Sequence, residues 1–213
     1  DYIELTTTTA TSLVSGYTLE AWAYPTTSTQ AHRILSNFQL SPNRGFGFGI
    51  RDRRWRHTTF GVKDYDTAND VVTTGVWTHL AVTLDNDNTA RIYVNGALHT
   101  VITHNTGARE STHTLNIGRN PTGTEYWEGR IDEVRIWDHV RTPAQIAKHW
   151  NRSLTGTELG LIGYYPFNEG TGTTTEDASP NNGDGTLFGC TWVEGPPLLD
   201  PMTDADSEWL ELP

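Results

Sequence analysis

The stretch "WTHLAVTLDNDNTARIYVNG", residues 77–96, decides the fold class of this 213-residue chain. Residues 77–84 and 90–94 are rich in β-branched, aromatic and other apolar side chains, which are typical of strands. The four residues between them, 85–88, are Asp and Asn, which favour turns. The stretch therefore predicts an antiparallel hairpin, and Asn95-Gly96 supplies the next tight turn.

Further strands and one helix are expected outside this hairpin. Most segments alternate between apolar and polar residues and are bounded by Gly, Asn, Asp or Pro, which is the pattern of a β-sandwich or barrel. In residues 45–50 glycines alternate with apolar residues, so one face of that strand is expected to lie under another backbone or to be thinly covered. Thr142 is a good N-cap before Pro143 and predicts a helix of about two turns. The other expected strands are residues 17–24, 115–118 and 131–137.

The composition restricts the class of partner and the compartment. Lys and Arg number 15 against 26 Asp and Glu, a net charge of −11, which argues against nucleic acid and anionic membranes as partners. No stretch has the pattern of a transmembrane span or a signal peptide. Cys190 is the only cysteine, so no internal disulfide is possible; it is expected to be buried, with an intermolecular bridge as the alternative. Abundant Thr and Gly with few Lys favour a secreted, extracellular or cell-surface β-protein.

Five segments, in order, resemble a laminin-G-like domain of the concanavalin A-like jelly-roll family. They are "WTHLAVTLD" (77–85), "ARIYVNG" (90–96), "LNIGRN" (115–120), "YWEGRIDEVRIW" (126–137) and "RTPAQIAKHW" (141–150). The resemblance implies an all-β fold: two antiparallel sheets face to face in a jelly-roll sandwich, with one short connector helix. It does not select a function, because this fold serves lectins, adhesins, glycosidases and spacers.

The order of the segments is permuted relative to this family. "LIGYYPFNEGTGTTTEDASPNNGDGTLFGCTWV" (161–193) resembles the beginning of such a module but stands near the end. We therefore expect one jelly roll over residues 1–199 and an acidic tail, 200–213, whose "EWLEL" resembles the opening "DYIEL". Residues 161–193 fold back onto their own chain, complete a neighbouring copy, or mark a piece of a longer tandem array.

This echo between the two ends motivates the main functional prediction. We expect a non-catalytic extracellular structural or adhesive module that assembles head to tail with copies of itself into a fibre. The C-terminal segment would donate its strand to a neighbour. Opposite charges on the tail and on the arginine-rich segment 51–57 support this contact. The expected subunit contacts are Tyr2, Ile3, Leu5, Trp209, Leu210 and Leu212.

Enzymatic motifs are missing from the sequence. Glycosidases of this fold carry paired carboxylates on one strand, close to "ExDxxE", and no stretch matches this spacing. No HExxH helix and no GxSxG elbow is present either. The chain is therefore predicted not to be an enzyme.

Calcium is the expected ligand ion. The resemblance implies a structural site at Asp132 in "RIDEV", with Asn168 and Glu169 from "FNEG". Independently, residues 176–185 gather acidic and amide side chains, including Asp177 and Asp184, and Ca²⁺ accepts such irregular oxygen sites. The alternative is that these residues form turns and that Asp132 only bonds backbone amides.

The alternative function is a glycan-binding module, a lectin or carbohydrate-binding unit of a larger secreted protein. Aromatic residues in polar surroundings are expected to stack on sugar rings: Trp55, Tyr65, Tyr126 and Trp127. Trp55, flanked by Arg51, Arg53 and Arg54, would suit an anionic polysaccharide or anchor a protein interface. Trp22, Trp77 and Trp137 lie on alternating strands and are expected in the core.

Overall fold

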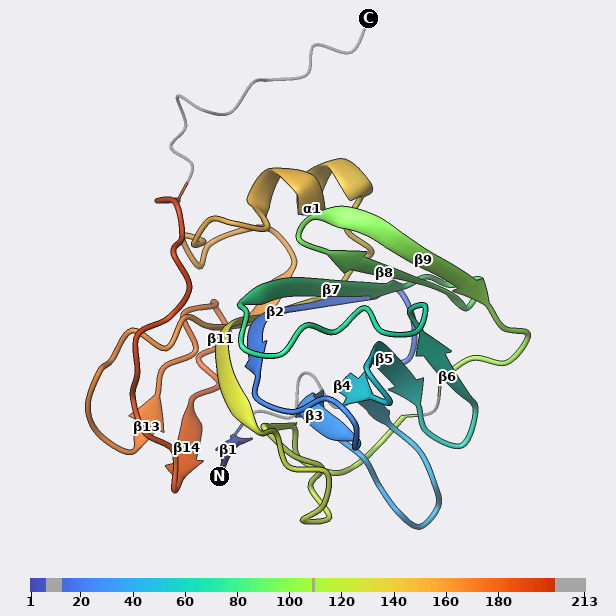
Figure 1. Ribbon diagram of the computed structural model, residues 1–213, viewed down its shortest axis with the longest axis horizontal. Helices are drawn as coiled ribbons and strands as arrows, with labels where there is room; N and C mark the ends of the chain where they lie inside the picture. The colour runs from blue at the N-terminus through green and yellow to red at the C-terminus, as the bar shows by residue number, and fades with distance from the viewer. Residues whose placement is uncertain (7–12, 109, 202–213) are drawn as a thin grey trace, which may run out of the picture.

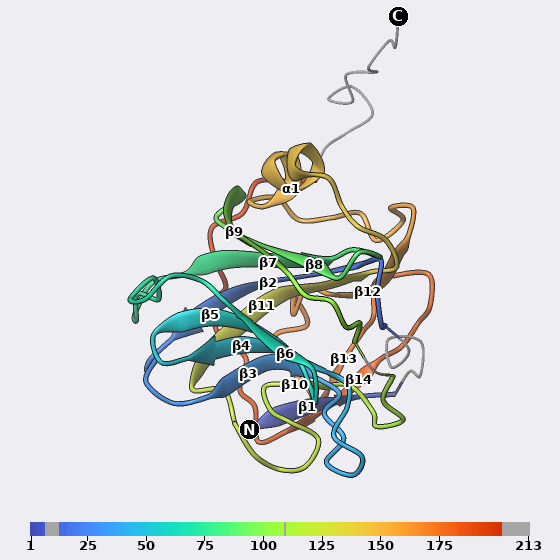
Figure 2. The same ribbon diagram turned by 90° about the vertical axis from the view of Figure 1, so that its right-hand side faces the viewer.

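The protein is a sandwich of two antiparallel β-sheets with one short helix on its outside (Figure 1). The computed structural model describes residues 1–6, 13–108 and 110–201. The two sheets lie face to face, and the helix α1 (Pro143–His149) covers the outer face of the smaller sheet (Figure 2). The expected all-β jelly-roll sandwich with one connector helix is thus confirmed.

The larger sheet has eight strands in the order β13-β14-β1-β10-β3-β4-β5-β6. Their bounds are β1 Tyr2–Leu5, β3 His32–Ser36, β4 Phe46–Arg51, β5 Arg54–Thr59, β6 Lys63–Asp66, β10 Asn116–Ile117, β13 Thr174–Thr175 and β14 Gly185–Phe188. The smaller sheet has six strands in the order β12-β11-β2-β7-β8-β9. Its strands are β2 Tyr17–Pro25, β7 Thr78–Leu84, β8 Thr89–Val94, β9 Ala97–Thr103, β11 Gly129–Trp137 and β12 Leu161–Tyr165.

The predicted hairpin is formed by β7 and β8, which pair from Leu80↔Val94 to Leu84↔Ala90. Asp85 closes its turn, because its Oδ1 accepts hydrogen bonds from the amides of Asp87 and Thr89 at 3.0 and 2.9 Å. The next turn needs Gly96, whose φ is +77°; a Cβ there would lie 2.4 Å from the Trp150 indole.

The core lies between the sheets and follows the predicted alternation. On β2, Tyr17, Leu19 and Ala21 face the core, while Glu20 and Trp22 point to the outer face. Residues from both sheets join one cluster, in which Trp55, Tyr65, Phe46 and Phe48 are among the largest fully buried side chains.

Segment 161–193 supplies strands to the sheets of its own chain. β12 pairs with β11, and β14 pairs with β1 from Tyr2↔Phe188 to Leu5↔Gly185. β1 also pairs with β10 on its other side, so Ile3 lies between Ile117 and Leu187. Of the three arrangements expected from the permuted order, this is the one in which residues 161–193 fold back onto their own chain.

The glycine face of β4 is covered in two different ways. A Cβ on Gly47 would lie 3.0 Å from Nη1 of Arg33, so the glycine makes room for a buried guanidinium lying across the strand. A Cβ on Gly49 would lie 2.0 Å from the carbonyl oxygen of His32, which is backbone. The expected approach of another backbone is therefore found at Gly49, and also at Gly45 just before β4, where a Cβ would lie 2.8 Å from the carbonyl oxygen of Asn37.

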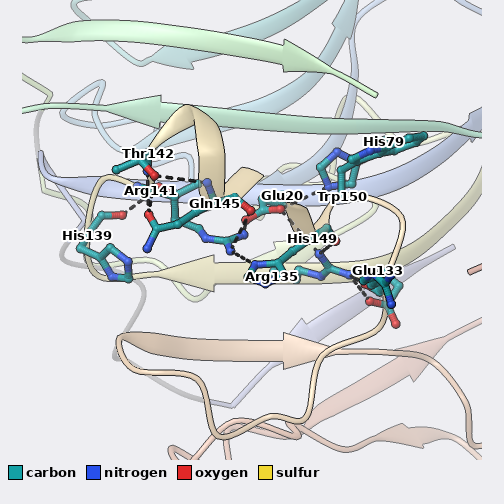
Figure 3. A network of polar contacts seen from close by, with 12 residues as sticks. Glu20, His79, Glu133, Arg135, His139, Arg141, Thr142, Gln145, His149 and Trp150 are labelled. Atoms are coloured by element: carbon teal, nitrogen blue, oxygen red, sulfur yellow. Dashed lines mark hydrogen bonds and ion pairs between the residues drawn. The ribbon is translucent and has the colours of Figure 1, made fainter. Parts of the chain in front are cut away.

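A network of buried charges fills the space between α1 and the outer face of the smaller sheet (Figure 3). Glu20 on β2 lies at its centre and accepts from Arg141 at 2.6 Å, with Arg135 at 3.6 Å and His79 Nε2 at 3.2 Å. Arg135 also pairs with Glu133 at 2.5 Å. These side chains are 0–3% exposed, so each buried charge is compensated by another.

The same network anchors α1 to the sheet. Nη2 of Arg141 lies 2.6 Å from Nδ1 of His149, in the last turn of the helix. Trp150 follows the helix and stacks on Trp22 of β2 with ring centroids 5.6 Å apart. Thr142 is the predicted N-cap, since its hydroxyl accepts from the amide of Gln145. α1 is thus held by ion pairs and stacking as well as by one buried apolar residue, Ile146.

Candidate functional site

A cleft of about 640 Å³ lies beside the start of β1 and of β11. Its walls come from β1, from the loop that precedes β11, from the first half of β11 and from the segment after β14. Aromatic side chains supply much of this lining: Tyr2, Trp77, Tyr126, Trp127, Phe167 and Trp192. A cleft of this size with an aromatic lining is typical of a site for a small organic ligand.

The aromatic rings are held by specific contacts. Trp192 donates from Nε1 to the carbonyl oxygen of Gly172 at 3.0 Å, and Trp127 donates to that of Arg130 at 3.2 Å. Trp77 packs edge-on against Tyr24 at 5.7 Å between ring centroids. These hydrogen bonds and ring contacts fix the aromatic walls before any ligand arrives.

Tyr126 is the most exposed of these rings, at 39%. It stands beside a stack in which Phe188 lies on Tyr2 at 4.6 Å and the guanidinium of Arg119 lies 3.2 Å from the centre of the other face of Tyr2. Nη1 of Arg119 also donates to the Tyr126 hydroxyl at 3.3 Å. Tyr126 is therefore positioned by Arg119 while much of its surface stays open to solvent.

A second hollow, of about 550 Å³, lies on the other side of the Tyr126 loop. Tyr126 and Glu128 line both hollows, so they form the wall between them. The second hollow is bounded by residues 29–32, by Arg51 at the end of β4 and by Asp52 in the turn that follows. The two hollows together form one continuous candidate surface around Tyr126.

The polar groups of the cleft are mainly carboxylates. Asp1, Glu128, Asp132 and Glu194 line it, against a single guanidinium, that of Arg130. Burial, together with the neighbouring charge of Glu133, raises the pKa of Asp132 to about 7. The thiol of Cys190 also lines the cleft; it is half-buried, and burial raises its pKa.

The structure brings only part of the predicted glycan or interface residues together. Tyr126 and Trp127 line the cleft, and Arg51 lines the second hollow. Arg53 and Arg54 lie elsewhere and are paired with Asp70 and Asp66 respectively.

The expectation that Trp55 and Tyr65 are exposed to sugars is wrong. Trp55 is 0% and Tyr65 is 1% exposed, and both belong to the core. Trp55 lies on β5, where its neighbours Arg54 and Arg56 point to the outer face, so the charged flanks surround an inward-facing ring. Trp22 and Trp137 are buried as expected, whereas Trp77 is only partly buried and lines the cleft.

Sequence reasoning missed Trp192, Glu128, Arg130 and Glu194, and it assigned Trp77 to the core. Glu128 and Arg130 directly follow Tyr126-Trp127 in "YWEGR", so their proximity to those rings was available in the sequence. The approach of residues 192–194 to this loop depends on the long-range pairing of β14 with β1, which leaves no local signal.

The residues predicted to bind calcium are divided between two places. Asp177 organises its own loop, accepting from the amides of Tyr164, Ser179 and Gly183 at 2.8–2.9 Å. Asp184 accepts from the amide of Asp177 at 3.0 Å. For these two aspartates the contacts match the turn-forming alternative.

The other candidate ligands differ from this pattern. Oε1 of Glu169 accepts from Thr175 and from the amide of Glu176, both at 2.8 Å, but its Oε2 is buried without a hydrogen-bond partner. The charge of Glu169 contributes to the raised pKa of Asp132, and Asn168 is exposed. Within residues 1–6, 13–108 and 110–201, no three His, Cys, Asp or Glu side chains converge on one point.

The residues predicted to contact another subunit are occupied within the chain or lie outside its described part. Ile3 and Leu5 are 7% and 2% exposed in the core, and Tyr2 is stacked on Phe188. Both sides of β1 are paired within the chain, and the expected role of these three residues in a neighbour's contact stays a prediction. Trp209, Leu210 and Leu212 lie outside the described residues. In the described part, no helix is long and apolar enough to cross a membrane.

Comparison with solved structures finds the same fold in several proteins. A putative carbohydrate-binding protein from Bacteroides ovatus matches with a TM-score of 0.70 and 22% identity over 87% of this chain. This chain spans 55% of that protein's length. The CBM40 of Ruminococcus gnavus IT-sialidase, bound to α2,3-sialyllactose, matches with a TM-score of 0.55 and 14% identity over 64% of this chain and 83% of its own.

Domain 4 of the extracellular arabinanase AbnA from Geobacillus stearothermophilus, in complex with arabinotriose, matches with a TM-score of 0.50 and 23% identity. The match covers 63% of this chain and 66% of that domain. At such identities these likenesses show the fold alone. No curated protein matches the chain. A family model, Laminin_G_3, matches residues 1–147, more than half of the sequence. The chain therefore belongs to the Laminin_G_3 family of the concanavalin A-like lectin/glucanase superfamily.

Proposed function

We propose that the protein is a glycan-binding module and that sugars bind in the cleft beside Tyr126. The observation that carries this proposal is the combination of fixed aromatic rings with free carboxylates around one open cleft. Sugar rings present apolar faces that stack on aromatic side chains and hydroxyl groups that donate to carboxylates. The carbohydrate ligands of the fold's solved neighbours agree with this proposal.

Tyr126 is the residue on which binding should depend most. It is exposed, it lines both hollows, and Arg119 holds its hydroxyl. Replacing it by alanine removes the stacking surface without disturbing a core residue. Leu98 on β9 offers a matched control, since it is also exposed and lies on a strand at the far edge of the molecule (Figure 1).

The test is a glycan array followed by calorimetry on the best neutral or charged ligand. We expect the intact chain to bind at least one glycan and Tyr126→Ala to weaken it about tenfold or more, equal to ~1.4 kcal/mol. Leu98→Ala should leave the affinity unchanged. An array without any bound glycan, or equal losses in the two variants, would contradict the proposal.

Binding, rather than hydrolysis, is the activity that we assign to the cleft. The raised pKa of Asp132 is a property that glycosidase acids share, and it is the one observation that favours hydrolysis. However, the family's paired-carboxylate spacing is missing from the sequence. Incubating the protein with the oligosaccharide that it binds and measuring new reducing ends distinguishes binding from hydrolysis. If new reducing ends form, and Asp132→Asn abolishes their formation, the cleft is a hydrolytic site.

A structural calcium ion at Asp132 and Glu169 is a second proposal. The buried, unpartnered Oε2 of Glu169 and the nearby carboxylate of Asp132 supply hard oxygen ligands. Asn168, backbone carbonyls and water would complete the coordination. We expect calcium to raise the free energy of unfolding by about 2.7 kcal/mol when its concentration is a hundredfold its Kd. The melting temperature should rise accordingly.

Matched variants test this calcium site. Asp132→Asn should remove the calcium-dependent shift, and Glu176→Gln, a neighbouring exposed carboxylate, should keep it. A melting temperature that is the same in calcium and in EDTA excludes the ion.

We further propose that the module is secreted and that it acts as one unit of a larger protein. Its fold is shared with a domain of an arabinanase described as extracellular. Fibre assembly by strand donation is the less favoured reading, because β10 and β14 already fill both sides of β1.

A further inference from the structure

The charges around the candidate cleft point to the class of glycan that it accepts, an inference that rests on the proposed glycan-binding function. Glu128 and Glu194 are exposed on the cleft walls, and neither forms an ion pair with any described residue. Asp1 and Asp132 add two more carboxyl groups to the same lining. A ligand entering this cleft therefore meets carboxylates that still lack cationic partners.

Cations that could hold an acidic sugar are scarce at the cleft. Arg130 is the one arginine or lysine of its lining, and its guanidinium lies 5.1 Å from the ring centre of Tyr24. Arg119 is covered by Tyr2, which its guanidinium contacts at 3.2 Å. Arg51, in the second hollow, lies 3.6 Å from Asp52. Arg130 is thus the one guanidinium of the cleft lining that could make a bidentate contact with a carboxylate or sulfate, and four carboxyl groups line the same cleft.

Neighbouring arginines of the larger sheet are also neutralised. Arg33 pairs with Glu125 at 2.6 Å, and Arg56 pairs with Asp66 at 2.6 Å. Because arginines of the arginine-rich segment form ion pairs with aspartates of their own sheet, this segment adds little positive potential to the hollows. The net charge of −11 for the chain acts in the same direction.

We propose that the cleft selects neutral, hydroxyl-rich glycans and rejects glycans that carry carboxylate or sulfate groups. The carboxylates serve both purposes: they accept hydrogen bonds from sugar hydroxyls and repel anionic sugars. In this respect the chain differs from the neighbour that was solved with sialyllactose.

The experiment compares matched pairs of oligosaccharides that share a backbone and differ by one acidic group. Suitable probes are lactose against its 3′-sulfated form and α2,3-sialyllactose, and xylo-oligosaccharides against the same oligosaccharides carrying one glucuronic acid, on one array with EDTA in the buffer. Pairs that bind are then measured by calorimetry. We expect the neutral member of each bound pair to bind about tenfold or more tightly than its acidic partner. The affinity for the neutral member should depend little on the salt concentration.

Charge variants separate repulsion from mere misfit. In the double variant Glu128→Gln/Glu194→Gln, the preference for the neutral member should fall about threefold or more, because two repelling charges within a Debye length are removed. The double variant Asp87→Asn/Glu110→Gln makes the same change of net charge at exposed positions outside both hollows and should leave the preference unaltered.

The possible outcomes are distinct. Equal or tighter binding of the acidic members would overturn the neutral preference while leaving glycan binding intact. A preference that both double variants leave unchanged would likewise overturn it, because the carboxylates would then not be its cause. Failure to bind any probe would instead contradict the proposed function itself.

Discussion

At the scale of single residues, buried polar side chains determine how stability responds to pH. His57 lies in the core, 0% exposed, with its Nε2 2.8 Å from the hydroxyl of Tyr17. Burial, together with the charge of Arg33, lowers its pKa to about 3, against 6.5 in an unfolded chain. The unfolded chain therefore binds a proton before the folded one does, so the stabilisation is complete above about pH 6.5 and is lost as the pH falls towards 3.

This difference predicts that acidification to pH 5 costs about 2 kcal/mol of unfolding free energy at His57 alone. His57→Gln keeps a hydrogen-bonding partner for Tyr17 but cannot titrate. We expect urea denaturation at pH 7 and at pH 5 to give a gap that is smaller in this variant by about that amount. An unchanged gap would mean that His57 is accessible to protons in the folded state.

At the scale of elements, the buried charge network decides whether α1 stays on its sheet. Burial raises the pKa of Glu20, but the charges of Arg141 and Arg135 and the hydrogen bond from His79 outweigh this and hold it below its usual range. The carboxylate is therefore charged and depends on its partners. A buried charge that loses its partner is expensive, whereas removing both charges is much less so.

Arg141→Met is therefore expected to destabilise the fold by about 3–5 kcal/mol. The double variant Glu20→Gln/Arg141→Met should recover a large part of this loss. Urea denaturation of the two single variants and the double variant gives the coupling energy. Additive losses would show that the two side chains do not depend on each other, contrary to their 2.6 Å contact.

At the scale of the whole molecule, segment 161–193 of the chain supplies strands to both of its own sheets. A chain that ends at residue 201 keeps every described strand, and we expect it to have the same oligomeric state in solution and the same melting temperature as the full chain. A chain that ends at residue 160 lacks β12, β13 and β14, which exposes the edge of β1 and part of the core, and it should aggregate. Light scattering of the three chains tests this, and loss of an oligomer on removing residues 202–213 would restore the strand-donation model.

The sequence predicted the fold better than the site, for a physical reason. Alternation and turn residues are local, so the hairpin of β7 and β8 and the N-cap Thr142 could be predicted from a few neighbouring residues. Alternation also divides each strand into two faces, but it does not say which polar face will be covered. Glu20 and His79 look like solvent-facing residues and are buried because α1 returns over them.

The candidate site is assembled from segments far apart in the chain. Tyr126 and Trp127 were predicted because they adjoin each other in a polar stretch. Trp192 reaches the same cleft through the pairing of β14 with β1. Trp55 was wrongly assigned to the site, because its position on the inner face of β5 depends on the register of that strand. A shift by one residue would have exchanged its face.

The pairing of β1 with β14 also sets the timing of folding. Tyr2 and Phe188, which stack on each other, are separated by almost the entire chain, so the larger sheet cannot be completed on the ribosome until residues 185–188 have emerged. Contacts between such distant residues slow folding, because a long loop must close before the contact can form. Until then β1 has a free edge, and the nascent module is exposed to aggregation from the synthesis of β1 until β14 has paired with it.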